Sequence, residues 1–267
     1  MPPDAAVLLN TDVVVDERWL EGWSAQPLPT KKLRWRRPGD AALAQRPGRR
    51  STPPATPSSY LGFGFCADYG VEDGPRFAEN RDVTVASGSS LLIKREPYAD
   101  IGGLEPTFWA YAEDQDLAWR ARLRGYRTIV AARARCWHKY RFGKTARNHR
   151  KFYLLERNRL WFLLRNYQAR TLLVVAPAVA VMELGTLADA TLHGYLVDKL
   201  RAYVDAVLGL PGVRRARRTI QKRRLVSDRT VFAQLAPTVR YPEIDSAALR
   251  LANVMLASWY RLARVLV

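Results

Sequence analysis

The hydrophobic pattern of the chain begins with residues 5–15, "AAVLLNTDVVV". An apolar run is broken there by the polar tripeptide Asn10, Thr11 and Asp12. The run predicts a buried strand that ends near Asn10 and a second apolar strand beyond Asp12. In α/β sheets, ligand-binding groups commonly lie at the carboxyl end of a strand, so Asn10 and Asp12 are candidate site residues.

A second pattern of this kind occupies residues 81–96, "RDVTVASGSSLLIKRE". Val83 and Val85 alternate with polar residues, the tripeptide at residues 87–89 breaks the alternation, and residues 91–93 resume it. We expect two half-strands with a backbone break between them. Ser87 and Gly88 would bring backbone amides close to a ligand at this break, although a tight packing turn explains the glycine equally well.

A third strand is predicted in "RTIVAARARCWHKY", residues 127–140. Ala132, Ala134, Cys136 and His138 alternate with larger or charged residues, which places them on one face. His138 then stands at the end of the strand. A lone histidine is more often structural than a ligand, so this position needs further support.

Between these strands, "FWAYAEDQDLAWRARLRGYR" (residues 108–127) holds the acidic residues Glu113, Asp114 and Asp116. Acids in the first turn, arginines later and Gly125 at the end predict a helix from about residue 114 to residue 124. A surface helix explains part of this pattern. It does not explain the aromatic run directly upstream, which places the carboxylates at an apolar edge, where their pKa values can be tuned.

The character of the chain changes to helix beyond residue 150. Residues 150–168 have a broad apolar surface with arginines at its margins, and residues 246–267 set arginines along one stripe. Such faces pack in a core or lie on a membrane, and the pattern leaves both open. Residues 171–182 are apolar but contain Pro177 and fall short of the roughly 20 residues of a spanning helix, so we expect a buried or interfacial helix.

These patterns predict an α/β region followed by a mostly α-helical region. We place the first at residues 1–150, with a long proline-rich and basic loop at residues 24–60, and the second, basic region at residues 151–267. No internal repeat is visible.

The composition of the chain restricts the kinds of partner that it is expected to bind. The 267 residues carry a formal net charge of +18, which favours an anionic partner: nucleic acid, an anionic membrane surface or a phosphorylated small molecule. Basic residues concentrate at residues 214–224, either as a solvated face or as phosphate contacts. Cys66 and Cys136 have no metal-like spacing, so neither a disulfide framework nor a zinc site is expected. The first residues show no signal-peptide pattern, which favours a cytoplasmic location.

The order of these motifs along the chain resembles that in a known protein family. The segments "LLNTDVVVDERWLE", "ASGSSLLIKRE", "GGLEPTFWAYAEDQDLAWRARLRGYR", "WHKY" and "ERNRLWFLLRNY" resemble successive motifs of family 2 glycosyltransferases, especially the bacterial rhamnosyltransferase-like members. The resemblance spans roughly residues 5–170. It implies a GT-A fold with a Rossmann-like nucleotide-binding half. It also implies inverting transfer from a nucleotide-diphosphate sugar to a glycan or lipid-linked acceptor in cell-envelope polysaccharide synthesis.

The resemblance also assigns roles. It makes Asp114 the general base that takes the proton of the acceptor hydroxyl, and Glu113 the residue that orients it or binds acceptor. It makes Asp12 and His138 ligands of a divalent cation, Mg²⁺ or Mn²⁺, beside the diphosphate. Asp116 is assigned to the start of the helix.

Four further residues are predicted to bind donor or acceptor: Asn10, Ser87, Gly88 and Arg157. Asn10 stands where the family's D-x-D motif has its first aspartate, which weakens the expectation of metal dependence. Arg157 and Asn158, in "ERNR", would contact a diphosphate or lipid phosphate, and a salt bridge on the helix face is an equal alternative.

The family's opening nucleotide-binding units precede its D-x-D motif, so the resemblance also predicts that this N-terminal segment is missing here. The expected location is the cytoplasmic face of the cell membrane, with peripheral attachment. The alternative function is a noncatalytic basic module that binds membrane or nucleic acid. Nucleic acid is not expected as a partner, because the acidic motifs would oppose a polyphosphate backbone.

Overall fold

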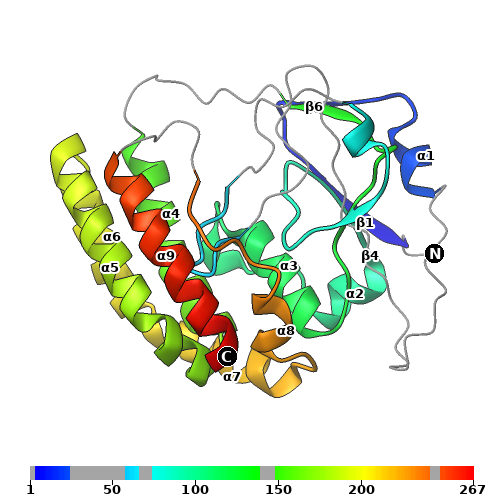
Figure 1. The fold of residues 1–267 in the computed structure, drawn as a ribbon. Coiled ribbons are helices and arrows are strands. Elements are labelled where there is room, and N and C mark those ends of the chain that lie inside the picture. The colour runs from blue at the N-terminus through cyan, green and yellow to red at the C-terminus, as the bar shows by residue number, and fades with distance from the viewer. Residues whose placement is uncertain (1–3, 25–57, 66–73, 139–147, 241–246) are drawn as a thin grey trace.

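The computed structural model of the chain describes residues 4–24, 58–65, 74–138, 148–240 and 247–267. The strands lie on one side of the molecule and the long C-terminal helices on the other (Figure 1). The predicted loop at residues 24–60 falls mostly outside the described residues. Its last three residues, 58–60, are fully buried and belong to no regular helix or strand.

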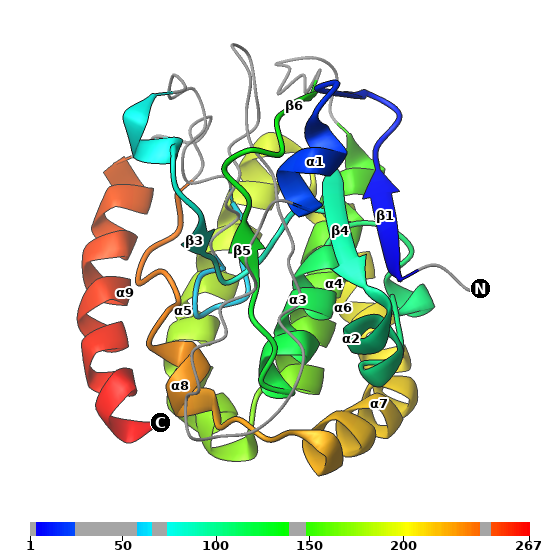
Figure 2. The same ribbon diagram turned by 90° about the vertical axis from the view of Figure 1, so that its right-hand side faces the viewer.

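The described strands form three short antiparallel pairs. Strand β1 (Ala5–Leu9) pairs with β4 (Ser90–Lys94), β2 (Val13–Val15) with β6 (Cys136–His138), and β3 (Arg81–Asp82) with β5 (Ile129–Val130). Figure 2 shows β1, β4, β5 and β3 in front of the helix α3 (Glu113–Leu123). The named strands in the described ranges contain no parallel pair, and a Rossmann-like half stays a prediction.

The alternation predicted around residues 132–138 is confirmed in burial. Ala132, Ala134, Cys136 and His138 are buried, whereas the residues between them are exposed. Only the last three residues form a regular strand, because the chain turns at residues 131–134, where the Ala134 amide donates to the Ala131 carbonyl. The result is that His138 lies at the end of β6, opposite Val13 of β2.

Helices make up the rest of the described chain. They are α1 (Trp19–Ser24), α2 (Arg95–Asp100), α3, α4 (His149–Asn166), α5 (Ala169–His193), α6 (Leu196–Leu208), α7 (Leu210–Arg223), α8 (Asp228–Phe232) and α9 (Ala247–Leu266), with 3-10 turns at Pro75–Phe77 and Pro106–Phe108. The predicted helices at residues 114–124, 150–168 and 246–267 are confirmed to within a few residues. The apolar run at residues 171–182 is part of the much longer α5.

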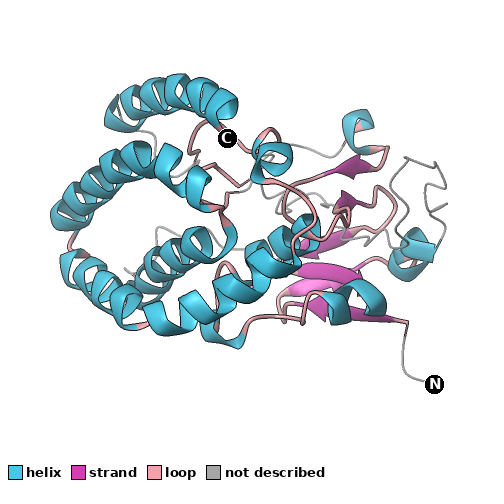
Figure 3. Ribbon diagram, turned by 90° about the horizontal axis from the view of Figure 1, so that it is seen from below, coloured by secondary structure: helices cyan, strands magenta, loops and turns pink. Residues whose placement is uncertain are grey.

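Helix α3 is almost completely enclosed, so its interpretation as a surface helix was wrong. Its residues Leu117 and Ala121 pack with Ile93 of β4 in one apolar cluster. Trp119, on another face, belongs to a second and larger cluster with Phe162 of α4. Because α3 contributes to both clusters, it fixes the strand side of the molecule to the helical side (Figure 3).

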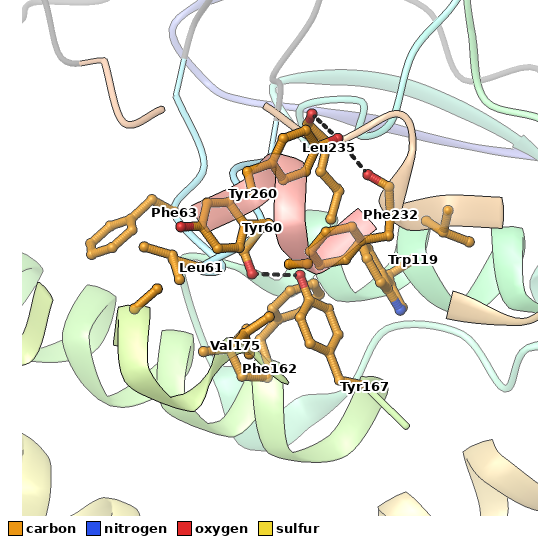
Figure 4. Close-up of a cluster of buried hydrophobic side chains, with 14 of the residues drawn as sticks. Tyr60, Leu61, Phe63, Trp119, Phe162, Tyr167, Val175, Phe232, Leu235 and Tyr260 are labelled. Carbon is orange, nitrogen blue, oxygen red and sulfur yellow. Dashed lines mark hydrogen bonds between the residues drawn. The ribbon is translucent and has the colours of Figure 1, made fainter. Parts of the chain in front are cut away.

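The larger cluster crosses the predicted boundary at residue 150. Tyr60 lies at its centre, among Trp119, Phe162, Tyr167 and Tyr260 (Figure 4). The Tyr167 hydroxyl donates to the Tyr60 carbonyl at 2.9 Å, and the Tyr260 hydroxyl donates to two carbonyls near α8 at 2.7 and 2.9 Å. These bonds satisfy polar groups that burial would otherwise leave unpaired.

A buried ionic cluster joins α4, α5 and α6. Lys199 is fully buried, and its ammonium donates to Glu156 and, at 2.8 Å, to Glu183. Arg159 donates to the same two carboxylates. Burial opposes ionisation of Glu183, but Arg159 and Lys199 outweigh it and lower the pKa of Glu183 to about 2. The four side chains thus fix the relative positions of three helices.

Candidate active site

The polar tripeptide at residues 10–12, after β1, lies beside residues 87–89, which we call the Ser-Gly-Ser break. The Asn10 amide donates to the Ser89 carbonyl at 3.0 Å and so extends the pairing of β1 with β4. The Val13 amide donates back to the Asn10 carbonyl at 3.1 Å, which turns the chain into β2. The two motifs that sequence analysis singled out are therefore neighbours.

Asp12 and His138 meet because β2 pairs with β6. Asp12 Oδ1 lies 3.0 Å from His138 Nε2. His138 is nearly buried, whereas about half of the Asp12 side chain (46%) is exposed. Carboxylate oxygen and imidazole nitrogen are suitable ligands for a divalent cation such as Mn²⁺.

Within the described ranges, no group of three or more His, Cys, Asp or Glu residues has metal-binding geometry. Beside nucleotide phosphates, Mg²⁺ is held by one or two protein carboxylates, with water and phosphate oxygens as its other ligands. Asp12 supplies one such carboxylate, and the metal role of Asp12 and His138 stays a prediction.

Glu113 and Asp114 at the start of α3 form what we call the acid pair, and Asp114 is hydrogen-bonded to the Ser-Gly-Ser break. Asp114 Oδ2 accepts from the Gly88 amide at 2.8 Å, and Asp114 Oδ1 accepts from the Gln115 amide at 2.7 Å. The Ser87 hydroxyl donates to Ser89 Oγ at 3.1 Å and shapes the turn. The Gly88 amide thus fixes the carboxylate of Asp114, and its predicted contact with donor or acceptor stays a prediction.

The environment of this pair favours the protonated carboxylic acid. Burial, and then the neighbouring charge of Asp114, raise the pKa of Glu113 to about 7. Burial also raises the pKa of Asp114, against the opposing effect of the Gly88 and Gln115 amides. Within the described chain, Glu113 Oε2 is buried and has no hydrogen-bond partner. Glu113 therefore exchanges a proton near neutral pH beside a second buried carboxyl group whose pKa is also raised, which is a suitable arrangement for acid–base chemistry.

A strained turn positions the acid pair. Trp109, Tyr111 and Ala112 have φ values of 61°, 66° and 65°, in the left-handed region that residues with side chains rarely adopt. Trp109 has ψ −58°, and the Ala110 amide donates to the Phe108 carbonyl at 2.7 Å, which defines a γ-turn of the rare, strained kind. Each such residue costs about 1–3 kcal/mol unless its surroundings enforce it.

Asn158 of α4 enforces this turn. Its side-chain amide is fully buried and donates to the carbonyls of Phe108, Ala110 and Tyr111 at 3.0, 2.8 and 2.7 Å. Three carbonyls of the turn converge on one nitrogen, which holds them in a single arrangement. Sequence reasoning noted Asn158 only beside Arg157, as a phosphate contact, because nothing in "ERNR" indicates a partner 50 residues away.

Arg157 supports the same turn from its outer side. Its guanidinium donates to Asn158 Oδ1 at 2.8 Å and to the Thr107 carbonyl at 3.3 Å, and it lies 4.3 Å from the centre of the Trp161 ring. The structure thus places Arg157 against backbone carbonyls and an aromatic ring. Its predicted phosphate contact stays a prediction.

The third acid of the motif has a structural role. Asp116 is fully buried; it accepts from Arg120 Nε at 2.7 Å and from the Asn166 amide at 2.8 Å. Arg120 in turn donates to the carbonyls of Ile101 and Gly103. Asp116 therefore connects α3 to α4 and to the loop after α2, a larger role than the helix start predicted for it.

The basic segment at residues 214–224 is partly engaged by the fold. Arg217 donates to the carbonyls of Leu164 and Tyr167, both at 2.6 Å. Arg223 pairs with Asp100, and Arg224 with Asp228. These three arginines attach α7 to its neighbours, which weakens the case for a dedicated nucleic-acid surface on this segment.

Comparisons with known proteins complete the description of the site. No protein-family model matches the chain, and no curated protein matches it. Among solved structures, the chain is similar to "Crystal structure of GalNAc-T7 with UDP, GalNAc and Mn2+", with a TM-score of 0.44 and 12% sequence identity. The match covers 66% of this chain and 34% of that chain, so the chain spans about a third of the length of that protein.

The contacts of Asn158 predict a large effect of Asn158→Asp on stability. The substitution keeps the side-chain size but replaces three donated hydrogen bonds by a carboxylate facing three carbonyls. We expect the free energy of unfolding to fall by about 2–4 kcal/mol in denaturant titration. The matched control is Asn148→Asp at the N-cap of α4, where Asp accepts from the Lys151 amide as well as Asn does. Equal, small effects of the two substitutions would contradict the role of Asn158.

The raised pKa of Glu113 predicts a pH-dependent effect of Glu113→Gln. As pH rises from 4.5 to about 7, the unfolded chain loses its proton while the folded chain retains it, so the free energy of unfolding falls. Removing the group removes this loss. We expect the variant to match the parent near pH 4.5 and to be more stable by roughly 1–3 kcal/mol at pH 8.

Denaturant titration at the two pH values measures this difference. Exposed Glu96 of α2 provides the control, because Glu96→Gln should shift stability equally at both pH values. If Glu113→Gln is no more stable than the parent at pH 8, the folded chain ionises Glu113 without losing stability. That result would contradict the raised pKa of Glu113.

Proposed function

We propose that the chain is an inverting glycosyltransferase that moves a sugar from a nucleotide-diphosphate donor to a hydroxyl of a glycan or lipid-linked acceptor. The observation that carries the proposal is the acid pair: two coupled carboxyl groups with raised pKa values, fixed to the Ser-Gly-Ser break and adjoining the strand end that leads to Asp12. The order of the sequence motifs, which resembles family 2 glycosyltransferases, supports the same function and a GT-A fold. Cell-envelope polysaccharide synthesis is the pathway that this resemblance favours.

Asp114 is the general base in this proposal. Its two carboxylate oxygens each accept one backbone hydrogen bond, which orients the group and leaves further lone pairs for the acceptor hydroxyl. The hydroxyl oxygen attacks the anomeric carbon while its proton passes to Asp114. The bond from that carbon to the diphosphate oxygen breaks, and the nucleoside diphosphate leaves with the electron pair.

Burial raises the basicity of Asp114. An apolar environment opposes the charged form of its carboxyl group, so the pKa of Asp114 lies above that of an isolated aspartate. Such a base is better matched to a hydroxyl near neutral pH. Glu113 also has an unpaired buried oxygen in the described structure, which is available to orient an acceptor group.

Asp12 and His138 are the residues that would hold a divalent cation, Mg²⁺ or Mn²⁺. A cation bound there would offset the negative charge of the departing diphosphate. Asn10 is hydrogen-bonded to Ser89, and Gly88 is hydrogen-bonded to Asp114. These contacts connect the segment that carries Asp12 with the acid pair. They support the assignment of Asn10 and residues 87–89 to donor or acceptor binding.

The test is turnover of sugar nucleotides by the whole chain. Release of nucleoside diphosphate from a panel of UDP-, GDP- and dTDP-sugars, with Mg²⁺ or Mn²⁺, should fall by about two orders of magnitude in Asp114→Asn. Its fold should be retained, because the amide oxygen still accepts from a backbone amide. In the parent, the rate should rise as pH rises from the acidic range, since the raised pKa of Asp114 keeps the proposed base protonated at low pH.

Asp82→Asn is the control for this experiment, because Asp82 is an exposed acid that pairs with Arg127 at the surface. Its turnover should equal that of the parent. Normal turnover by Asp114→Asn would remove Asp114 from the role of base. If neither this chain nor a longer form of it turns over any of the donors with either metal, the function itself is refuted.

A further inference from the structure

Three helices far from the acid pair carry an apolar surface that the fold does not use. Helix α5 packs against α6 and against α9, on the side of the molecule away from the strands (Figure 1). Their exposed large apolar residues are Leu173, Val181, Leu184 and Leu192 on α5, Val197, Leu200, Val204, Val207 and Leu208 on α6, and Leu251, Val254, Met255, Leu262, Val265 and Leu266 on α9. We call these residues the outer apolar face.

Helix α6 shows most clearly that this face is not an ordinary surface. Its buried positions hold Lys199, Ala202 and Ala206, whereas its valines and leucines point outwards. A helix on the surface of a soluble domain normally buries its large apolar residues instead. Lys199 faces inwards because Glu156 and Glu183 bind it there, so the fold sets this inverted orientation and leaves the apolar side uncovered.

The charges of these helices are sorted by sign. Glu183, Asp198 and Asp205 point towards the protein, where they bind Lys199, His149 and Tyr153 respectively. Helix α9 contains no acidic residue. The exposed acid of α5 is Asp189, which pairs with His193 at 3.1 Å. The arginines that are exposed along these helices are Arg170, Arg201, Arg250, Arg261 and Arg264.

This distribution identifies the occupant of the face. A two-fold dimer would bring the same arginine-rimmed patch of two copies together, and the outer apolar face offers few acids to pair with them. An anionic bilayer instead supplies an apolar interior for the leucines and valines and negative headgroups for the arginines. Charge complementarity therefore favours lipid over a second copy.

The geometry favours a position in the membrane interface over a crossing. Among the described helices, α5 is long and apolar enough to cross a membrane, with a mean hydropathy of 1.9 over its most apolar window. Its other side is committed to the protein. Val175, Ala178 and Met182 lie in the main core, Glu183 binds Lys199, and the Val174 carbonyl accepts from Trp259 Nε1 at 3.0 Å.

We propose that the outer apolar face of α5, α6 and α9 docks onto the surface of an anionic lipid bilayer, with its apolar residues in the interface and its arginines at the headgroups. This inference is independent of the proposed sugar transfer, because none of the residues involved belongs to the candidate active site. It places a lipid-linked acceptor within reach if the proposed function holds.

Vesicle flotation of the whole chain tests the proposal. We expect binding to vesicles of 70% phosphatidylcholine and 30% phosphatidylglycerol, and at least fivefold weaker binding to phosphatidylcholine alone. The double variant Val204→Gln and Leu208→Gln removes two exposed apolar residues of α6 without changing the charge. It should weaken binding to the anionic vesicles by at least tenfold.

The matched control is Val7→Gln and Val14→Gln, two exposed valines on the strand side of the molecule. It should bind as the parent does, and circular dichroism should show both double variants folded. Binding by the α6 variant at the parental level would show attraction by net charge alone and overturn the docking surface. Absence of flotation at low salt, with a dimer that the α6 variant converts to monomer in sedimentation, would assign the face to a second copy.

Discussion

The fold of this chain depends on one buried amide. Asn158 gathers three carbonyls from residues 108–111, and only that convergence makes a turn with three left-handed residues tenable. Helix α3 begins directly after the turn, so the direction in which Glu113 and Asp114 emerge is set by a side chain of α4. The helical half of the molecule is therefore part of the apparatus that positions the candidate site, and the two predicted regions share one core across residue 150.

The crowded acids of α3 show how neighbouring carboxylates acquire different properties. Asp116 lies two residues further along the helix, inside the core, where it pairs with Arg120 and accepts a hydrogen bond from Asn166. Asp114 accepts from backbone amides, Glu113 Oε2 has no hydrogen-bond partner in the described structure, and the guanidinium of Arg157 is directed to the turn. Burial without a neighbouring cation raises the pKa values of Glu113 and Asp114. In a chain of net charge +18, the acid pair is distinguished by the absence of a bound base among its described contacts.

Charge is sorted by the same principle in the C-terminal helices. Lys199, Arg159 and their two glutamates compensate one another in the interior, which is the condition under which buried ions are tolerated. Since this cluster fixes the inward side of α6, the apolar residues of α6 have no place in the core. The inverted orientation of α6, and with it the part of the proposed lipid surface that α6 contributes, thus follows from this packing arrangement.

The sequence by itself determined the helices at residues 114–124, 150–168 and 246–267, the ends of the first strands and the choice of candidate site residues, because local periodicity and helix-end signals do not depend on distant contacts. It also indicated the acid pair through the aromatic run beside it. Only the tertiary structure decided which acid is structural, that Asn158 and Arg157 support a turn some 50 residues away, and that Tyr60 belongs to the core. Those outcomes depend on which side chains the fold buries against one another. The spacing of residues along the chain does not indicate a contact partner that lies on another helix.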